Sequence, residues 1–439
     1  MPDGATSNHP AVQAQLDRLS MLSPGRDVLG LQRILALLDA LDNPHNHLPP
    51  SFHVAGTNGK GSTCAFLRAM LEAQGYRVHV FTSPHLVRYN ERIRIAGNLI
   101  DDDYLASLLS EVLDASGNIR PSFFEVTTAV AMLAFARMPA DACVFEVGLG
   151  GRLDATNVLE HPISCGIAGL AIDHKEFLLA PEDKVPADPL ARIAFEKAGI
   201  AKRDAPLVTH GYAPQMDEAI SSVAAKIGAQ WFKRDRNWFS EKTEVAVLYR
   251  DETGEFALPL PSLEGIHQSD NAALAVAMLR YQNALPVDLE SMASGIQNAT
   301  WPARLQKLGA GPLIALAPSS ETWLDGGHNP HAAAEVRRFL TDRGPATLIM
   351  GLLANKDLDG YLKELQDLPL DIVAITVPNH PSHTPEAITE VAKSLGFTAR
   401  TAPNVQSAIE SSINAETILI AGSLYLAGEV LRFNQQFPL

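Results

Sequence analysis

The sequence is poor in cysteine and in positive charge, and each shortage excludes a class of protein. Only three cysteines occur in 439 residues, namely Cys64, Cys143 and Cys165. Their odd number and apolar neighbours argue against a disulfide framework and fit free thiols in a reducing cytoplasm. Lysine and arginine total 35 against 50 acidic residues, which gives a formal charge of −15. This balance excludes a protein that binds nucleic acid or anionic membranes non-specifically.

Long hydrophobic runs are also missing. The longest apolar stretch, TTAVAMLAFARM at 127–138, falls short of the ~20 residues that a membrane helix needs. The first ten residues lack the cationic-then-apolar pattern of a signal peptide. We therefore expect a cytoplasmic protein with no membrane or nucleic-acid partner.

Short apolar runs alternate with amphipathic ones along the whole chain, a pattern typical of parallel sheets with crossover helices. We predict strands at 51–55, 77–82, 142–147, 163–170, 205–209 and 243–249, and helices at 28–41, 62–74, 122–138, 190–199, 214–227 and 268–283. A second series of strands, each followed by a helix, is predicted at 322–325, 346–351, 371–377, 398–402 and 417–422. A boundary near residue 299 then separates two domains.

The predicted fold class is α/β. Residues 1–299 form a parallel-sheet, phosphate-loop NTPase-like domain, and residues 300–439 form a smaller, Rossmann-like α/β domain. The acidic, proline-rich stretch 178–190 is predicted to be a surface loop.

The stretch SFHVAGTNGKGST (51–63) resembles a phosphate loop but departs from the strict G-x-x-x-x-G-K-[ST] pattern, because Val54 replaces the first glycine and Gly61 follows Lys60. A glycine-rich turn between a strand and a helix directs backbone N–H groups and the helix dipole at an anion. We predict phosphate binding here, with Ser62 as the helix N-cap. The alternative is a tight turn with a solvated lysine.

Two oxygen-bearing side chains are predicted at neighbouring strand ends. Ser83 follows the strand 77–82, and Glu146 interrupts the apolar strand 142–147, where an unpaired carboxylate is costly. Because Mg²⁺ prefers oxygen ligands, Ser83 and Glu146 form a plausible metal site. A Ser-Pro turn and a buried salt bridge are the alternatives.

Other charged residues leave more than one interpretation open. His174 is either a second metal ligand or a core histidine. Lys197, on a helix, is most simply a salt-bridge partner. The group Arg88, Arg92 and Arg94 either neutralises an acidic substrate or carries ordinary exposed charges.

In the second domain, Asp325 and His328 follow the strand 322–325, and Arg304 lies beside the domain boundary, where it is placed to clamp a triphosphate. The stretch TILIAGSLYLAG runs from a strand through a turn into a helix.

Eight motifs together resemble one family, the folylpolyglutamate synthases and bacterial bifunctional dihydrofolate synthase/folylpolyglutamate synthases, which belong with the Mur ligases. The motifs are AGTNGKGS, TSPHL…ERI, EVGLGGRLDATN, IDH, EKAGI, WPARLQ, LDGGHNP and GSLYLAG, in family order over 27–430. The family shares the glycine after the lysine, so the resemblance identifies the loop as an ATP site.

The resemblance implies a ligase that uses ATP to convert a carboxylate into an acyl phosphate, which the amine of L-glutamate attacks to give an amide. It implies dihydropteroate and folates as small-molecule substrates, two Mg²⁺ sites and a monomer.

The resemblance also assigns residues by motif. ATP contacts are Gly56, Thr57, Asn58, Gly59, Lys60, Gly61, Ser62, Asn271, Arg304 and Asp325; metal ligands are Ser83, Glu146, His174 and Lys197, the last as a CO₂-derived carbamate. Pterin-side residues are Leu29, Gly30, Phe123, Phe124, Glu125, Leu153, Asp154 and Ala155. Lys60, Lys197, His174 and His328 are assigned to catalysis, and Ser423 to substrate binding.

Two spacings depart from the family pattern. His174 to Lys197 and Arg304 to Asp325 are longer than expected, and the stretch 178–190 accounts for the first excess. Two alternative functions are another Mur-type ligase, acting on a cell-wall precursor, and a folylpolyglutamate synthase that acts only on tetrahydrofolates. Only residues 1–50 precede the first strand, so we expect no separate nucleotide-sugar domain. A non-catalytic protein that binds ATP as a switch is a further alternative. Such a protein needs fewer metal ligands than the set found here, which argues against it.

Overall fold

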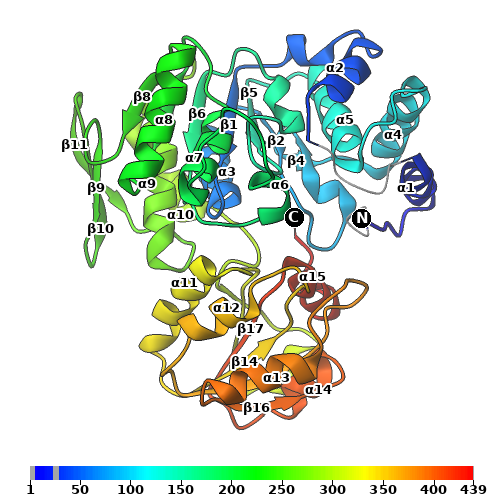
Figure 1. Cartoon of the computed structure of the whole chain (residues 1–439), viewed down its shortest axis with the longest axis vertical. Coiled ribbons are helices and arrows are strands. Elements are labelled where there is room, and N and C mark those ends of the chain that lie inside the picture. The colour runs from blue at the N-terminus through cyan, green and yellow to red at the C-terminus, as the bar shows by residue number, and fades with distance from the viewer. Residues whose placement is uncertain (1–4, 23–28, 439) are drawn as a thin grey trace. The chain divides into compact units, whose positions relative to one another are not determined.

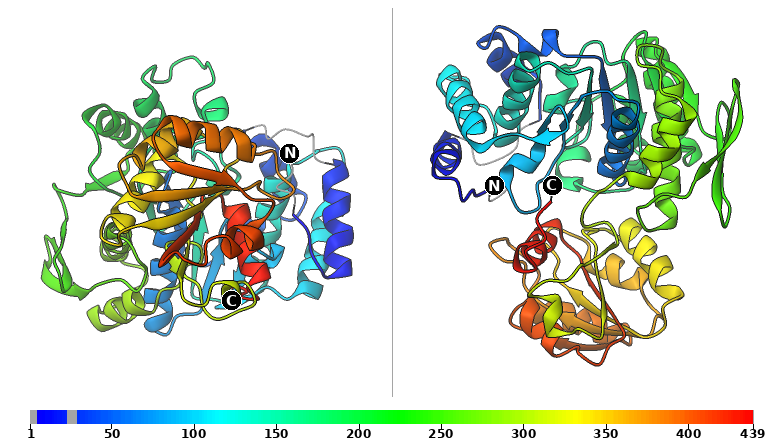
Figure 2. Two further views of the ribbon diagram at one scale, coloured as in Figure 1. Left: turned by 90° about the horizontal axis from the view of Figure 1, so that it is seen from below. Right: turned by 180° about the vertical axis from the view of Figure 1, so that it is seen from behind.

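The computed structural model describes residues 5–22 and 29–438 and divides into two compact units. Unit 1 comprises 1–262 and 268–300, and unit 2 comprises 263–267 and 301–439. Figures 1 and 2 show the elements of both units. Val28, the first residue of the predicted helix 28–41 and the neighbour of the predicted pterin-side residue Leu29, lies outside the described residues.

Unit 1 is built on an eight-stranded sheet in the order β4-β3-β2-β5-β1-β6-β7-β8. The strands from β2 to β8 in this order are parallel, whereas β3 and β4 are antiparallel to their neighbours. Their bounds are β1 Ser51–Ala55, β2 Val78–Phe81, β3 Ile93–Ile95, β4 Asn98–Leu99, β5 Ala142–Glu146, β6 Ser164–Ile167, β7 Pro206–Thr209 and β8 Gln230–Lys233. The central strand β1 is buried along its whole length, as a strand covered on both faces requires.

Helices cover the two faces of this sheet (Figure 1). They are α1 Pro10–Leu22, α2 Gln32–Asp39, α3 Lys60–Ala73, α4 Asp102–Ala115, α5 Phe123–Arg137, α6 Lys175–Leu178, α7 Pro189–Ala198, α8 Pro214–Ile227, α9 Ile266–Arg280 and α10 Leu289–Asn298, with 3₁₀ turns η1 Pro44–His47, η2 Tyr89–Arg92 and η3 Ala155–Val158. Helix α3 packs beside α10, and α7 beside α8. Among the described residues, no helix is long and apolar enough to cross a bilayer.

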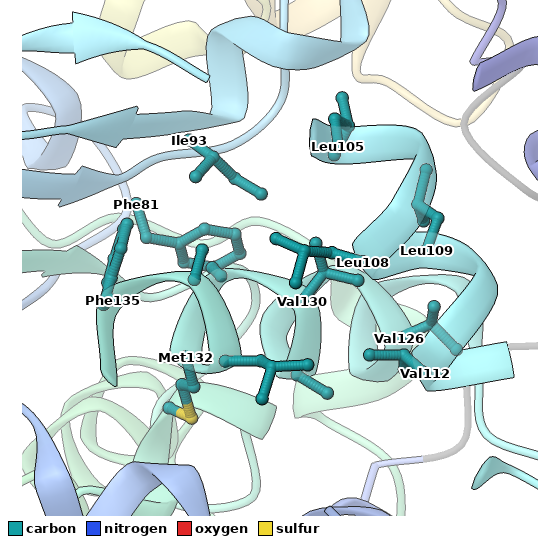
Figure 3. Packing of buried hydrophobic residues seen from close by; sticks show 14 of the residues in the cluster. Phe81, Ile93, Leu105, Leu108, Leu109, Val112, Val126, Val130, Met132 and Phe135 are labelled. Atoms are coloured by element: carbon teal, nitrogen blue, oxygen red, sulfur yellow. The ribbon is translucent and has the colours of Figure 1, made fainter. Parts of the chain in front are cut away.

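The core beside β2 and β5 is formed by α1, α2, α4 and α5. Figure 3 shows Phe81 of β2 directed toward Leu108 of α4 across this layer, with Phe135 of α5 beside Phe81. Helix α5 is apolar almost all round, because it lies between the sheet and the outer helices. Its packing fixes the carboxyl ends of β2 and β5, which carry two predicted metal ligands.

A separate three-stranded antiparallel sheet extends from unit 1. Its strands are β9 Phe239–Lys242, β10 Ala246–Asp251 and β11 Gly254–Pro259. The predicted strand 243–249 overlaps β10. Its predicted place in the parallel sheet was wrong, because β10 pairs antiparallel with β9 and β11. Its residues alternate between buried and exposed, as expected for a hairpin with one solvated face.

Unit 2 has a six-stranded sheet in the order β12-β13-β17-β14-β15-β16. All its pairs are parallel except β12 with β13. The strands are β12 Gln306–Lys307, β13 Glu321–Leu324, β14 Ala346–Met350, β15 Leu370–Ala374, β16 Thr398–Thr401 and β17 Thr417–Ala421, and the helical elements are η4 Ile314–Leu316, α11 Pro330–Thr341, α12 Leu358–Glu364, α13 Pro385–Ser394, α14 Val405–Glu410 and α15 Leu424–Phe433. The predicted α/β class is therefore confirmed for both units.

Two predicted boundaries at the site were wrong. Helix α3 begins at Lys60 with Gly59 as N-cap, so Ser62 is a buried residue of the first turn rather than the cap. The strand predicted at 163–170 ends at Ile167. It stops there because the carbonyl of Gly169 accepts hydrogen bonds from the phosphate-loop backbone instead of continuing the ladder.

Candidate active site

The centre of the candidate site is the loop Gly56–Gly59, which joins β1 to α3. The N–H groups of Thr57 and Asn58 donate to Gly169 O at 2.8 and 3.1 Å, which ties the loop to the segment after β6. Lys60 Nζ folds over the loop and donates to the carbonyls of Gly56 and Thr57 at 3.1 and 3.3 Å. Because α3 begins at Lys60, the N–H groups of its first turn, including those of Gly61 and Ser62, lie at this loop with the positive end of the helix dipole. The arrangement is suited to binding phosphate.

Gly59 is required at its position for two reasons. Its φ of +86° lies in the left-handed region, and a Cβ there would stand 2.3 Å from Asn271 Oδ1. The same contact shows that Asn271 of α9, a predicted ATP contact, lies directly against the loop. The Asn271 amide is oriented by donating to Gln268 Oε1 at 3.0 Å.

Glu146 and Ser83 lie side by side at the carboxyl edge of the sheet. Glu146 pairs with Val54 of β1 and is 4 % exposed. The Ser83 backbone N–H donates to Glu146 Oε2 at 3.2 Å. Burial and the Glu146 charge raise the pKa of the Cys64 thiol on α3, while Lys60 lowers it, so both charges reach that point of the helix. The structure thus brings together the two predicted ligands of the first metal and places them near the loop.

The glycine turn after β5 allows α7 to approach closely. A Cβ at Gly151 would lie 2.8 Å from Glu196 O and 3.0 Å from Lys197 Cα. Lys197 is 5 % exposed, and its Nζ donates to Gly150 O at 3.5 Å. Among residues 5–22 and 29–438 it forms no ion pair, so the salt-bridge interpretation was wrong.

The environment of Lys197 favours the neutral amine. Burial, followed by the cation of Lys60, lowers the pKa of Lys197 to about 7, although Asp173 and Asp154 act in the opposite direction. These influences place Lys60, Asp154, Asp173 and Lys197 in one electrostatic neighbourhood.

His174 is half-buried and precedes α6 with a left-handed φ of +50°, so it is not a core histidine. Its backbone N–H donates to Asp173 Oδ1 at 2.8 Å. Within the described part of the chain, no cluster of three or more histidine, cysteine, aspartate or glutamate side chains is placed to hold a metal. Of the four predicted metal ligands, only Glu146 and His174 belong to these four residue types, so the predicted set does not form such a cluster.

Asp154, a predicted pterin-side residue, organises the glycine turn. Its Oδ2 accepts from Leu149 N at 2.8 Å, and its Oδ1 accepts from Thr156 N at 3.0 Å and from Thr156 Oγ1 at 2.5 Å. Burial raises the pKa of this carboxyl, and the hydrogen bonds oppose that shift. The neighbouring Leu153 is half-buried and Ala155 is buried.

The sequence analysis missed His53, which continues this network into the centre of the sheet. Because the Thr156 hydroxyl donates its only hydrogen to Asp154, it accepts from His53 Nε2, which lies 2.8 Å away. His53 is fully buried, its pKa is lowered to about 3 chiefly by burial, and its Nδ1 has no hydrogen-bond partner among the described residues. The available signal was a lone histidine in the apolar strand SFHVA, just before the phosphate loop.

The remaining pterin-side residues lie around the start of α5 and before α2. A Cβ at Gly148 would stand 2.3 Å from Phe124 Cζ, so Phe124 lies directly over the glycine turn. The Glu125 carboxylate accepts from Ser122 N at 2.6 Å, closing the N-terminal turn of α5, and from Arg33 Nε at 3.0 Å. Phe123 is buried, whereas Leu29 and Gly30 are half-buried just before α2.

The arginine group is not an exposed charged surface. Arg92 is 1 % exposed, its Nε donates to His85 Nδ1 at 2.9 Å, and its guanidinium lies 5.4 Å from the centre of the Phe123 ring. Arg94 is half-buried, and desolvation lowers its pKa to about 10. The interpretation as ordinary exposed charges was therefore wrong for Arg92.

In unit 2, four predicted residues lie at the carboxyl ends of β13 and β17. Asp325 Oδ2 accepts from Leu305 N at 3.0 Å, which holds the stretch after Arg304 against the strand end. A Cβ at Gly326 would lie 2.9 Å from Arg304 Nη1 and 2.3 Å from Leu424 Cδ2. The remaining two residues are His328, with Nδ1 at 3.2 Å from Gly326 O, and Ser423, whose Oγ caps α15 by accepting from Tyr425 N at 3.2 Å.

Comparisons with known proteins agree with this architecture. Residues 316–433 match the family model described as "Dihydrofolate synthetase, C-terminal domain". The chain is 32 % identical over 420 residues to the folylpolyglutamate synthase of Lacticaseibacillus casei, covering 91 % of this chain and 93 % of that one. It is 31 % identical over 407 residues to the dihydrofolate synthase/folylpolyglutamate synthase of Escherichia coli, covering 92 % and 90 %.

A solved structure described as E. coli FolC in complex with DHPP and ADP superposes with a TM-score of 0.85 at 30 % identity, covering 97 % of this chain and 98 % of that one. A bifunctional folylpolyglutamate synthase/dihydrofolate synthase with Mn, AMPPNP and L-glutamate bound superposes with a TM-score of 0.82 at 29 % identity, with the same coverage.

A phosphate loop at the carboxyl edge of a parallel sheet, a buried carboxylate beside it and a second α/β unit define the class: an ATP-dependent ligase. The identity and coverage of the relatives also define the family. The chain belongs to the family of folylpolyglutamate synthases and dihydrofolate synthases.

Proposed function

We propose that this chain joins L-glutamate to dihydropteroate, giving dihydrofolate, and to tetrahydrofolate species, giving folylpolyglutamates, with ATP as the energy source. The observation that carries this proposal is the position of Lys60 and its loop near the buried Glu146–Ser83 pair. Family membership supplies the substrate class, and the site supplies the groups that ATP-driven activation of a carboxylate requires.

The reaction proceeds through an acyl phosphate. An acceptor carboxylate oxygen attacks the γ-phosphorus of ATP and ADP leaves; the glutamate amine then forms the amide bond, and phosphate and a proton are released. Lys60 and the first turn of α3 stabilise negative charge on the phosphates. The loop Gly56–Gly59 is assigned to the phosphates; its Thr57 and Asn58 N–H groups tie it to Gly169, which leaves the N–H groups at the start of α3 for the phosphate oxygens. We assign Asn271, Arg304 and Asp325 to further ATP contacts.

The residues present fit a divalent cation. The Glu146 carboxylate is almost fully buried next to the half-buried Ser83, and carboxylate and hydroxyl oxygens match the ligand preference of Mg²⁺. We assign Ser83 and Glu146 to one cation and His174 with modified Lys197 to a second. Bound Mg²⁺ would supply positive charge that neutralises the developing charge on the phosphates.

We infer that Lys197 carries a CO₂-derived carbamate. Two observations support this: its burial against the glycine turn and a pKa of about 7, which leaves neutral amine available to add CO₂. The adduct is an anion, so the change turns a cation that repels metal into an oxygen ligand.

Dihydropteroate is assigned to the region of Leu29, Gly30, Phe123, Phe124, Glu125 and the turn at Leu153, Asp154 and Ala155, whereas His328 is assigned to catalysis and Ser423 to substrate binding. Glu125 and Asp154 already accept internal hydrogen bonds, so part of their contribution is to hold the surrounding backbone in place. That the protein is a cytoplasmic monomer without nucleic-acid or membrane partners stays a prediction from the sequence.

Phosphate release, measured with dihydropteroate, tetrahydrofolate and a UDP-muramyl acceptor in the presence of ATP and L-glutamate, tests the proposal. We expect release with at least dihydropteroate, and mass spectrometry should show addition of one glutamate. Release only with the UDP-muramyl acceptor would establish the alternative ligase instead.

A further inference from the structure

The segment between α6 and α7, residues 179–188, has no role in the proposed chemistry, yet it is fastened next to the site. The sequence predicts a surface loop here, and most of its residues are exposed. One of its acidic residues, Glu182, forms ion pairs outside the loop. It joins a group of four charged side chains, which we name the Arg–Glu quartet: Arg152, Glu182, Arg192 and Glu196.

A single oxygen of Glu182 bridges two arginines. Glu182 Oε2 accepts from Arg152 Nη2 at 2.6 Å and from Arg192 Nη2 at 2.7 Å. Arg152 belongs to the glycine turn after β5, whereas Arg192 is on α7. The loop is therefore attached at one point to both elements that enclose Lys197.

The fourth member, Glu196 of α7, connects the same two elements. Arg152 donates to Glu196 Oε2 through Nε at 3.1 Å and to Oε1 through Nη2 at 2.9 Å. Arg192 Nε lies 3.0 Å from Glu196 Oε1, and both of these side chains are almost fully buried. Two guanidinium groups and two carboxylates balance in charge; without Glu182, one positive charge is left in excess on a partly buried group of side chains.

Apolar contacts extend the attachment toward the predicted pterin side. Leu178 reaches to 2.9 Å from a Cβ placed on Gly150, so it covers the glycine turn. Leu29, Leu149 and Phe177 are half-buried and pack against the same apolar cluster as Leu178. The glycine turn leads into Leu153 and Asp154, which are assigned to the acceptor, so the loop begins next to that part of the expected acceptor site.

We propose that Glu182 is a positioning residue that fastens the 179–188 loop as a wall of the acceptor pocket and so determines how tightly the pteroate-type acceptor binds. The assignment to the acceptor rests on the proposed function; the fastening itself rests only on the quartet. The two parts are therefore tested separately.

The first test measures attachment of the loop without using activity. Lys184 is exposed within the loop and is followed by Val185, so trypsin can cut between them. We expect Glu182→Gln to speed this cleavage roughly three- to tenfold, in line with the modest energy of partly exposed ion pairs. Asp183→Asn is the matched control, because it removes the same charge even closer to the cut; we expect it to match the wild-type rate. Equal rates in the two variants would overturn the proposed attachment.

The second test measures kinetics in full-length protein. We expect Glu182→Gln to raise KM for dihydropteroate roughly three- to tenfold, with KM for ATP and kcat near those of the wild type and of Asp183→Asn. An unchanged acceptor KM, or equal rises for acceptor and ATP, would overturn the role in the pocket. If the wild type shows no turnover of dihydropteroate while the cleavage difference persists, the proposed function fails and the attachment stands.

Discussion

The absence of one side chain at Gly59 shows how a single residue shapes the site. The left-handed backbone there directs the loop into α3, and the missing Cβ leaves space for the Asn271 amide. A substitution at Gly59 therefore has two costs: a backbone cost from the left-handed φ and a steric cost from the contact with Asn271.

Gly59→Ala is expected to weaken Mg·ATP binding by more than roughly tenfold, because the added Cβ displaces Asn271, an assigned ATP contact, and because a left-handed backbone costs a non-glycine residue about 1–2 kcal/mol, which drives the free loop out of the conformation that binds phosphate. Titration calorimetry measures this. Gly75→Ala is the control, since Gly75 has a similar φ of +93° but nothing within 4 Å of its Cβ position. Equal affinity in the two variants would show that neither the left-handed backbone at Gly59 nor its contact with Asn271 is needed for nucleotide binding.

Lys197→Ala is expected to reduce kcat roughly a hundredfold, because it removes the carbamate oxygens assigned to the second cation, and the loss of one group that helps to stabilise the developing phosphate charge costs on this scale. A small exogenous carboxylate should restore part of the rate by replacing the carbamate oxygens. Lys175→Ala, which removes an exposed amine, is the control. Wild-type turnover in Lys197→Ala would remove the lysine from the metal site.

Carbamylation of Lys197 should depend on pH with a defined sign. The pKa of the amine in the folded protein is lowered to about 7, so the neutral form that adds CO₂ increases as pH rises through 7. With ¹³C-labelled bicarbonate, a carbamate NMR signal should appear over this range and be missing in Lys197→Ala. A signal of equal size in both proteins would place the adduct elsewhere.

At the scale of elements, the central strand and the glycine turn are joined by the His53–Thr156–Asp154 chain of hydrogen bonds. Buried polar chains are costly when incomplete, because each unpaired group keeps its desolvation penalty. The chain thus links the strand that carries the phosphate loop to the turn that carries the predicted pterin-side residues.

Thr156→Val breaks this chain and leaves the His53 Nε2–H buried without an acceptor, which should lower the free energy of unfolding by about 1–3 kcal/mol. Urea unfolding followed by circular dichroism measures the loss. Thr128→Val is the control, because the Thr128 hydroxyl donates only to the carbonyl of Phe124 one helical turn earlier. If both variants unfold at the same urea concentration, the His53–Thr156–Asp154 hydrogen bonds contribute no more to stability than the single hydrogen bond of Thr128.

Local sequence patterns predicted most elements near the site, but some strands have no local pattern that predicts them. Apolar runs ending in glycine or polar residues predicted β1, β2 and β5 and the positions of Ser83 and Glu146. The short strands β3 and β4 and the hairpin β9–β11 were missed or misplaced, because their pairing is decided by partners distant in sequence. The early end of β6 likewise depends on hydrogen bonds from the loop at Thr57 and Asn58.

At the scale of the whole molecule, each unit has its own hydrophobic core. The cluster of unit 2 contains no residue of the clusters around the first sheet. Because a domain with its own core can unfold as a cooperative unit, we propose that the units respond differently to nucleotide.

Scanning calorimetry should resolve two unfolding transitions. Mg·ATP at roughly 100 times its Kd should stabilise the unit that carries the phosphate loop by about 2.7 kcal/mol, and hydrogen exchange should assign that transition to unit 1. Lys60→Ala should remove most of the shift. A shift confined to unit 2 would contradict the assignment of the nucleotide to the loop.

By itself the sequence determined the α/β class, the phosphate loop, the order of the motifs and the resemblance to one ligase family, since these depend on residues that are near neighbours along the chain. Tertiary structure decided which side chains meet: Glu182 with Arg152 and Arg192, and His53 with Thr156. It also set the burial that lowers the pKa of Lys197. These features arise from packing between segments far apart in sequence, and desolvation and pairing energies exist only once that packing has formed.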